Sequence, residues 1–179
     1  MILSAKQAHD LAPLALKLLA AFRDPSSPQW SPLEWRGLKF NNRLGLAGGV
    51  DKDGASIEDW WTFGPGFIEI GTVTPVGQGP NPGKIIDRDG ANFTLWNKMG
   101  FPGKGAEHVR ANLDDLPPDR VTPVFVNIGK NRDTPNEQAM VDYVKCIDII
   151  GDRADAWVVN ISSPNTTGLR DLFQPERFR

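Results

Sequence analysis

The chain has 179 residues, of which 40% are hydrophobic and 23% are charged, and its formal net charge is −2. This length supports one domain with a buried core, and the near-balance of 20 basic and 22 acidic residues argues against nucleic-acid binding. A single cysteine, Cys146, excludes an intramolecular disulfide bond and, within an apolar helical pattern, indicates a packed thiol. Two distant histidines argue against a zinc site, and no segment approaches the ~20 apolar residues that cross a bilayer.

The first predicted element is an amphipathic helix close to the N-terminus. Ser4 to Gln7 has the form of a capping box, and Asp10 offers a second N-cap. Pro13 is expected either in the first turn after Asp10 or as a kink in a longer helix. Apolar residues recur at helical spacing: Leu11, Leu14, Ala15, Leu18, Leu19 and Phe22. The residues alone favour a helix packed on a core over a helix on a membrane surface.

Strand–loop–helix units then follow one another along the chain. A short hairpin with Gly37 in its turn comes first, and a second hairpin, 85–96 with its turn at Asp89 and Gly90, is inserted later. Thr134 to Glu137 is interpreted as a capping box that opens the last helix. The predicted strands are Leu44–Ala47, Gly66–Ile70, Pro123–Val126 and Ala156–Val159, and helices are predicted near 57–63, 106–116 and 137–150.

Such units in series predict an α/β fold with a parallel sheet. Polar loops after every strand favour a closed (β/α)8 barrel of the TIM type over an open sheet. In such a barrel the site lies at the carboxyl ends of the strands, where this chain carries Lys52, Thr72, Asn127 and Asn160. A complete barrel needs eight strands and ~250 residues, so the chain is expected to supply about half of one.

The densest polar cluster follows the last predicted strand, which reads as buried on both faces. Residues 160–170 read N-I-S-S-P-N-T-T-G-L-R. Pro164 holds Ser163 on an extended turn, and the amides of Asn160 and Asn165 can pair with a planar ligand that alternates C=O and N–H groups. Each residue alone is typical of a turn that caps backbone groups, but the whole cluster at a strand end indicates a site.

Four of these motifs together resemble class 2 dihydroorotate dehydrogenase, the quinone-linked type. They are Gly45–Gly54, Glu69–Pro75, Asn127–Asn131 and Asn160–Arg170, and the likeness runs from about Gln7 to Leu172. The resemblance implies an FMN-dependent barrel enzyme that oxidises dihydroorotate to orotate in de novo pyrimidine (UMP) biosynthesis, with quinone as the second electron acceptor. It implies no metal.

The resemblance also assigns roles by position. Ser163 is expected to be the catalytic base that takes the C5 proton, at a position where the similar class 1 enzymes have cysteine. The expected substrate-binding residues are Lys52, Asn97, Lys98, Met99, Gly100, Phe101, Asn160 and Asn165. The expected FMN-binding residues are Gly48, Gly49, Lys52, Thr72, Asn127 and Asn160. His9 and Arg88 are expected to line a quinone site.

The same resemblance divides the chain into a helical extension, 1–30, on the quinone and membrane side, and the first part of the FMN barrel, 31–179. The protein is expected to contact the cytoplasmic face of a bacterial-type cell membrane peripherally. If it does not, it is expected to be cytoplasmic. The chain is expected to end where the active-site lid would begin. The later strands, with a second flavin-contacting lysine and phosphate-binding glycine loops, would lie in a C-terminal half outside this sequence.

Two alternatives stay open at this point. One is an inactive, truncated half-barrel, and the other is a different FMN barrel that acts on a pyrimidine; Ser163 and the N-terminal helix argue against the second. The terminal Arg179 also allows the hypothesis that a trypsin-like cut in an exposed lid made this end, with the other half still docked. The quinone species and the oligomeric state are left open.

Overall fold

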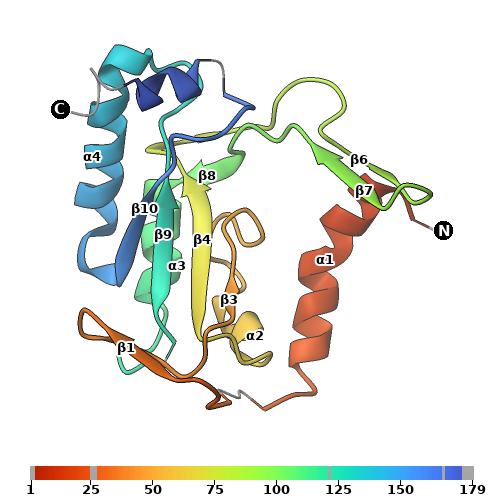
Figure 1. Cartoon of the computed structure of the whole chain (residues 1–179), viewed down its shortest axis with the longest axis vertical. Helices are drawn as coiled ribbons and strands as arrows, with labels where there is room; N and C mark the ends of the chain where they lie inside the picture. Colours follow the sequence, from red (N-terminus) through yellow and green to blue (C-terminus); the bar gives the residue numbers. More distant parts are fainter. Residues whose placement is uncertain (1–2, 25–27, 121, 167, 175–179) are drawn as a thin grey trace.

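A four-stranded parallel sheet forms the centre of the computed structural model, which describes residues 3–24, 28–120, 122–166 and 168–174 (Figure 1). The predicted start of a lid, 175–179, lies outside the described residues. The strands occur in the order β10-β9-β4-β3, and every neighbouring pair is parallel, which confirms the predicted parallel sheet. Their bounds are Gly45–Leu46 for β3, Phe67–Val73 for β4, Val124–Ile128 for β9 and Ala156–Val159 for β10.

Alternation along the central strands gives the sheet two different faces. Ile68 and Ile70 of β4, with Val124 and Val126 of β9, are fully buried in the hydrophobic core. The helices that cover this face also contribute to that core, for example through Val109 and Cys146. These helices are α2 (Ile57–Trp61), α3 (Ala106–Asp114) and α4 (Ala139–Ile150). The opposite face, called the inner face below, carries the intervening residues of β4 and β9.

Three aromatic rings close the inner face at the amino-terminal ends of the strands. Phe67 and Phe125 stack with their ring centroids 5.1 Å apart, and Phe40 meets both rings edge-on at 6.2 and 6.1 Å. Gly45 has to be glycine here, because a Cβ atom on it would lie 2.0 Å from the Phe67 ring. These rings form an aromatic floor, and the polar residues of the inner face lie on its carboxyl-terminal side.

The two predicted hairpins are present, and one differs at its turn. β1 (Leu33–Trp35) and β2 (Leu38–Phe40) are antiparallel around Arg36 and Gly37, which have φ values of 50° and 82°. These values suit a tight hairpin turn, as predicted for Gly37.

The second hairpin pairs β6 (Ile86–Asp89) with β7 (Thr94–Asn97), so the chain turns at Gly90 as predicted, but Asp89 is the last residue of β6 and not part of the turn. Asp89 instead pairs with Thr94 across a longer loop, and its carboxylate accepts the backbone N–H of Ala91 at 3.0 Å. The segments before and after this hairpin form a further antiparallel pair, β5 (Val76–Gln78) and β8 (Gly103–Gly105).

The N-terminal helix, α1 (Ala5–Ala20), starts at the predicted capping box. The Ser4 side chain accepts the Gln7 backbone N–H, and the Gln7 side chain accepts the Ser4 backbone N–H. Pro13 lies inside the helix, so the alternative start at Asp10 is not used. The helix packs against α2 and β6 (Figure 1). Leu16 is buried, whereas apolar side chains on its other side are about half exposed: Leu11, Leu14, Leu18 and Leu19.

The start of α4 differs from the predicted capping box. Residues Asn136–Gln138 form a 3-10 turn, α4 begins only at Ala139, and neither start has a side-chain cap hydrogen bond. Pro135 is extended, with φ −59° and ψ 150°, and has no N–H to be capped. The loop is held by Lys130, which is 2% exposed and whose ammonium donates to the Thr134 carbonyl at 2.7 Å.

The strand β10 also departs from its prediction as a strand buried on both faces. Within the described part of the chain it forms the edge of the sheet and pairs only with β9. Val159 is consequently 51% exposed, and the rest of the strand is half-buried. An apolar β-branched run therefore predicted the strand but not its position at an edge.

Cys146 is a packed thiol, as its helical pattern predicted. It is fully buried, and burial raises the pKa of the thiol from its ordinary value of 9.0 to about 12. We expect native Cys146 not to react with a thiol reagent such as DTNB at about pH 8, and the urea-unfolded chain to react at once.

Because the thiol ionises first in the unfolded chain, its contribution to the unfolding free energy is lost as pH rises from 9.0 toward 12. Urea titrations across this range should show a smaller pH dependence for Cys146→Ala than for the wild type. Rapid labelling of the folded chain would contradict the buried position.

Candidate functional site

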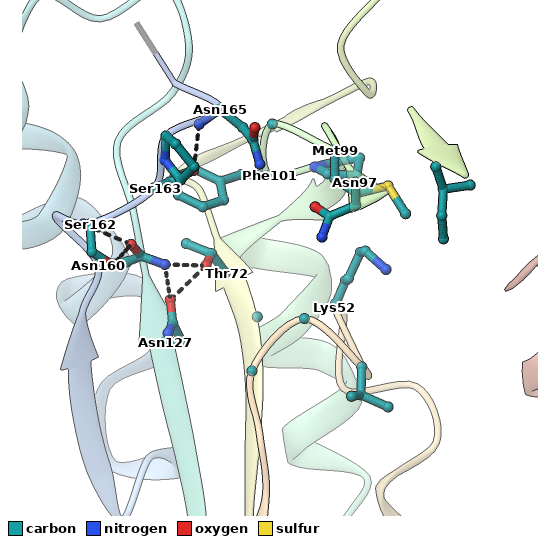
Figure 2. Close-up of a pocket in the computed structure, with 18 of the residues that line it drawn as sticks. Lys52, Thr72, Asn97, Met99, Phe101, Asn127, Asn160, Ser162, Ser163 and Asn165 are labelled. Atoms are coloured by element: carbon teal, nitrogen blue, oxygen red, sulfur yellow. Dashed lines mark hydrogen bonds between the residues drawn. The ribbon is translucent and has the colours of Figure 1, made fainter. Parts of the chain in front are cut away.

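A cavity of about 510 Å³ opens at the carboxyl ends of the parallel strands (Figure 2). Its size falls within the ~300–1,000 Å³ typical of small-molecule and cofactor sites. Thr72, Asn127 and Asn160, from three neighbouring strand ends, form a polar wall. Apolar side chains from the β6–β7 hairpin and the loop after it also line the cavity: Ile86, Leu95, Met99, Phe101 and Pro102. Phe101 lies beside Ser163 and Thr72 (Figure 2). The cavity thus suits a flat ligand with a polar edge.

Most residues selected from the sequence lie together around this cavity. They are His9, Gly48, Gly49, Lys52, Thr72, Asn97, Met99, Gly100, Phe101, Asn127, Asn160, Ser163 and Asn165. Lys98 and Arg88 do not line it. The Lys98 backbone N–H donates to the Ile85 carbonyl at 2.7 Å, and the Arg88 guanidinium donates to the Leu3 carbonyl just before α1.

Thr72, Asn127 and Asn160 form a closed ring of hydrogen bonds, called the polar ring below (Figure 2). The Thr72 hydroxyl donates to the side-chain oxygen of Asn127 at 2.7 Å. The Asn160 amide nitrogen donates to the Thr72 hydroxyl at 2.9 Å and to the Asn127 oxygen at 3.3 Å. Parallel register brings the three strand ends to the same edge of the sheet, so the ring is assembled by the fold itself.

The loop after β10 is fixed by the bonds that its polar residues make. The Asn160 side-chain oxygen accepts the Ser162 backbone N–H at 3.2 Å, and the Ser163 hydroxyl accepts the Asn165 backbone N–H at 3.2 Å. Outside the cavity, the Arg170 guanidinium donates to the Ser162 carbonyl at 3.0 Å. Turn capping and cavity lining, which the sequence offered as alternatives, are here combined in the same side chains.

The loop after β3 presents Lys52 between two aspartates with structural contacts. The Asp51 carboxylate accepts two backbone N–H groups at the start of α2, at 2.9 and 3.1 Å, and burial raises its pKa. The Asp53 carboxylate accepts the Lys104 backbone N–H at 2.8 Å, which ties the loop to β8. The aspartates therefore hold the loop, and only the lysine between them lines the cavity.

Lys52 is the half-buried cation of the cavity. Burial lowers the pKa of its ammonium group, while the neighbouring Asp53 and Asp51 act in the opposite direction. Its Nζ atom lies 3.2 Å from His9 Nε2, so the cavity touches α1 at this point. A partly desolvated ammonium group of this kind favours an anionic ligand, because the ligand charge would replace lost hydration.

Gly48 and Gly49 are required for two different reasons. Gly49 has φ +94°, and a Cβ atom there would meet nothing within 4 Å, so its backbone faces open space. Its N–H donates to the Gly71 carbonyl at 2.7 Å, which joins the β3 loop to β4. A Cβ atom on Gly48 would lie 2.4 Å from the Glu69 carboxylate, so Gly48 leaves room for that side chain.

Glu69 is the main residue near the site to which the sequence reasoning gave no role. It lies on the inner face of β4, and its carboxylate accepts the Asn127 side-chain N–H at 2.7 Å. A charged residue between Ile68 and Ile70 in a buried strand was the signal available in the sequence. The cavity walls also include Val50, Gly71, Ser162 and Pro164. The described residues contain no group of three or more His, Cys, Asp or Glu side chains placed to hold a metal ion.

A family model and the known relatives compared with this chain all carry the name dihydroorotate dehydrogenase. The family model described as "Dihydroorotate dehydrogenase" matches residues 33–179. A protein of Deinococcus radiodurans named "Dihydroorotate dehydrogenase (quinone)" is 50% identical over 133 residues, which cover 74% of this chain and 36% of that protein. One of the same name from Stenotrophomonas maltophilia is 42% identical over 183 residues, covering 99% of this chain and 51% of that protein.

A solved structure gives the same answer for the fold. The crystal structure of DHODH from Eimeria tenella in complex with ferulenol matches with a TM-score of 0.80 and 34% identity, over 97% of this chain and 48% of that chain. The prediction of a partial α/β barrel is confirmed by this likeness together with the parallel sheet. The chain spans about half the length of the Stenotrophomonas relative, 51%, and of the Eimeria chain, 48%.

The half-buried charge of Lys52 leads to a prediction on stability. We expect Lys52→Met to be at least as stable as the wild type at neutral pH, because the variant buries no ammonium group. The lowered pKa means that the unfolded chain binds more protons than the folded chain below 10.5, so wild-type stability rises with pH in that window. The advantage of the variant should therefore shrink as pH rises.

Thermal unfolding at neutral pH and near pH 10.5 measures this difference. Lys39→Met, at an exposed position on β2, is the matched control and should show no such trend. A Lys52→Met variant that is less stable at neutral pH would contradict the reading of Lys52 as a group held in place for a ligand.

Proposed function

Because the chain belongs to the dihydroorotate dehydrogenase family, in its quinone-linked class, we propose that its cavity oxidises dihydroorotate to orotate. In this proposal FMN takes the hydride and quinone is the second electron acceptor, within de novo pyrimidine (UMP) biosynthesis. The observation that carries the proposal is the convergence on one cavity of Lys52, the polar ring and the loop of Ser163. These groups come from four separate strand ends.

The groups that line the cavity support a flavin site. Its polar wall offers amide and hydroxyl groups, and the open space over Gly49 allows a flat ring to approach the backbone. FMN, when bound, supplies the hydride acceptor of the reaction. The proposed FMN-binding residues are Gly48, Gly49, Lys52, Thr72, Asn127 and Asn160.

Dihydroorotate would bind beside the flavin site with its carboxylate near Lys52. The amides of Asn97 and Asn165 can pair with the alternating C=O and N–H groups of the pyrimidine ring. Met99, Gly100 and Phe101 line the same cavity and would exclude water from the ring. Lys98 remains a proposed contact only through its place between Asn97 and Met99, since its own side chain does not line the cavity.

Ser163 is proposed to take the proton from C5 of dihydroorotate while hydride leaves C6 and the C5=C6 double bond forms. The half-buried hydroxyl is held by the Asn165 backbone N–H at 3.2 Å, so its oxygen has a fixed position at the cavity wall. Serine is a weak base, and its own proton has to pass to a relay as the C5 proton arrives. The apolar wall supports this step because it keeps the reacting atoms away from bulk water.

The helix α1 supports a proposed quinone and membrane side. His9 lines the cavity, and Arg88 connects β6 to the start of α1, so both proposed quinone residues lie where α1 meets the rest of the fold. None of the described helices has the length and apolar character needed to span a bilayer. We propose peripheral contact at the cytoplasmic face of the membrane, with 1–30 as the extension and 31–179 as the barrel part.

The chemical test uses the purified chain, loaded with FMN and mixed anaerobically with dihydroorotate. We expect the flavin absorption band to bleach, because the substrate reduces the bound flavin. Ser163→Ala should retain FMN and lose flavin reduction by a factor on the order of 100 at about pH 7, since only the proton transfer is removed.

Equal reduction rates in Ser163→Ala and the wild type would contradict the role of Ser163. A folded chain without flavin colour would contradict the proposed function and favour the inactive half-barrel. Circular dichroism of each sample separates that outcome from unfolding.

The membrane proposal has its own test on α1. Leu14 and Leu18 are both 58% exposed on this helix, and their replacement by glutamate removes apolar contact area. We expect Leu14→Glu/Leu18→Glu to lower binding to phospholipid vesicles by at least about tenfold in a co-sedimentation assay.

The matched control places the same charges on α4, where Met140 and Val144 are 70% and 44% exposed. Met140→Glu/Val144→Glu should bind vesicles as the wild type does. Equal losses in both double variants would mean that the effect is one of net charge, and would contradict a membrane face on α1.

A further inference from the structure

We propose that Glu69 is a positioning residue of the site and acts through Asn127. The inference rests on the proposed function, because it concerns how the polar ring is prepared for FMN and substrate. Glu69 lies on the inner face of β4, beyond the aromatic floor formed by Phe40, Phe67 and Phe125. Its carboxylate faces the side chain of Asn127.

The contact fixes which end of the Asn127 amide faces which neighbour. The Glu69 carboxylate oxygen accepts a hydrogen bond from the side-chain NH₂ group of Asn127 at 2.7 Å, so the NH₂ end of this amide faces Glu69. The side-chain oxygen of Asn127 then points away from Glu69. There it accepts the Thr72 hydroxyl at 2.7 Å and the Asn160 amide at 3.3 Å.

The orientation of the Asn127 amide in turn fixes the donor and acceptor roles of Thr72 and Asn160, up to the loop of Ser163. Since Thr72 donates to Asn127, its oxygen is free to accept the Asn160 NH₂ group at 2.9 Å. The side-chain oxygen of Asn160 consequently faces the loop and accepts the Ser162 backbone N–H at 3.2 Å. The Glu69 carboxylate thus determines which group donates and which accepts in each of the following bonds.

Gly48 belongs to the same arrangement. A Cβ atom on Gly48 would lie 2.4 Å from the Glu69 carboxylate and 3.3 Å from the Asn127 amide nitrogen. Gly48 has no positive φ value, so its backbone would accept a side chain, and the restriction is one of space alone. Gly48→Ala would therefore push the carboxylate off Asn127, and its effect should resemble that of a Glu69 variant.

The first measurement needs no ligand. In ¹⁵N-labelled chain, we expect the side-chain NH₂ signals of Asn127 to be shifted and protected from exchange by the carboxylate. Glu69→Ala and Gly48→Ala should both move these signals to free-amide positions, and Glu69→Gln, which keeps an acceptor oxygen, should largely preserve them. Glu34→Ala, at an exposed position on β1, is the control and should leave them unchanged.

The second measurement is a fluorescence titration with FMN. Glu69→Ala, Gly48→Ala and Asn127→Ala should each weaken FMN binding by about tenfold, and Glu69→Gln by less than about threefold. If Glu69 acts through Asn127, Glu69→Ala adds no further loss in the Asn127→Ala background. Circular dichroism confirms that each variant is folded.

The two measurements separate this inference from the proposed function. A wild-type chain that binds no FMN contradicts the proposed function, while the Asn127 signals still decide the role of Glu69. Asn127 signals that do not change in Glu69→Ala overturn the inference. FMN losses that multiply in the Glu69→Ala/Asn127→Ala double variant also overturn it, because they would mean that the two residues act independently.

Discussion

The parallel register of β4, β9 and β10 is the constraint on which the rest of the site depends. It brings Thr72, Asn127 and Asn160 to one edge of the sheet, where they satisfy one another in a closed ring of hydrogen bonds. Such buried polar networks are stable only when every member has its partner, and a satisfied network holds each side chain in one orientation. Asn160 extends this order into the loop of Ser163, and Lys52 enters the same cavity from the loop after β3.

One face of the sheet supplies the hydrophobic core, and the other face carries polar residues of the site. Ile68, Ile70, Val124 and Val126 are fully buried under the helices and supply the core, whereas the intervening inner-face residues include Glu69 and Asn127. A one-residue shift in register would exchange the two sets, so the hydrophobic pattern that stabilises the sheet also places the polar ring. The glycines complete the arrangement, because Gly45 makes room for the aromatic floor and Gly48 for the Glu69 carboxylate.

Much of this organisation could be predicted from the sequence, because strand ends, capping boxes and hairpins carry local signals. The Ser4 capping box and the four parallel strands are such cases. The capping box predicted at Thr134 does not form, and the buried Lys130 ammonium, four residues earlier in the chain, donates to the Thr134 carbonyl instead. The exposure of β10 and the partner of Glu69 depend on which strands are neighbours, and no local pattern encodes that.

The most direct test of the central claim is a crystal structure of the chain with FMN and orotate. The account predicts the flavin ring against Thr72, Asn127 and Asn160, with orotate between the flavin, Lys52 and the loop of Ser163. The bond between Glu69 and Asn127 should remain in that complex. A flavin bound elsewhere, or orotate bound away from Ser163, would contradict the account.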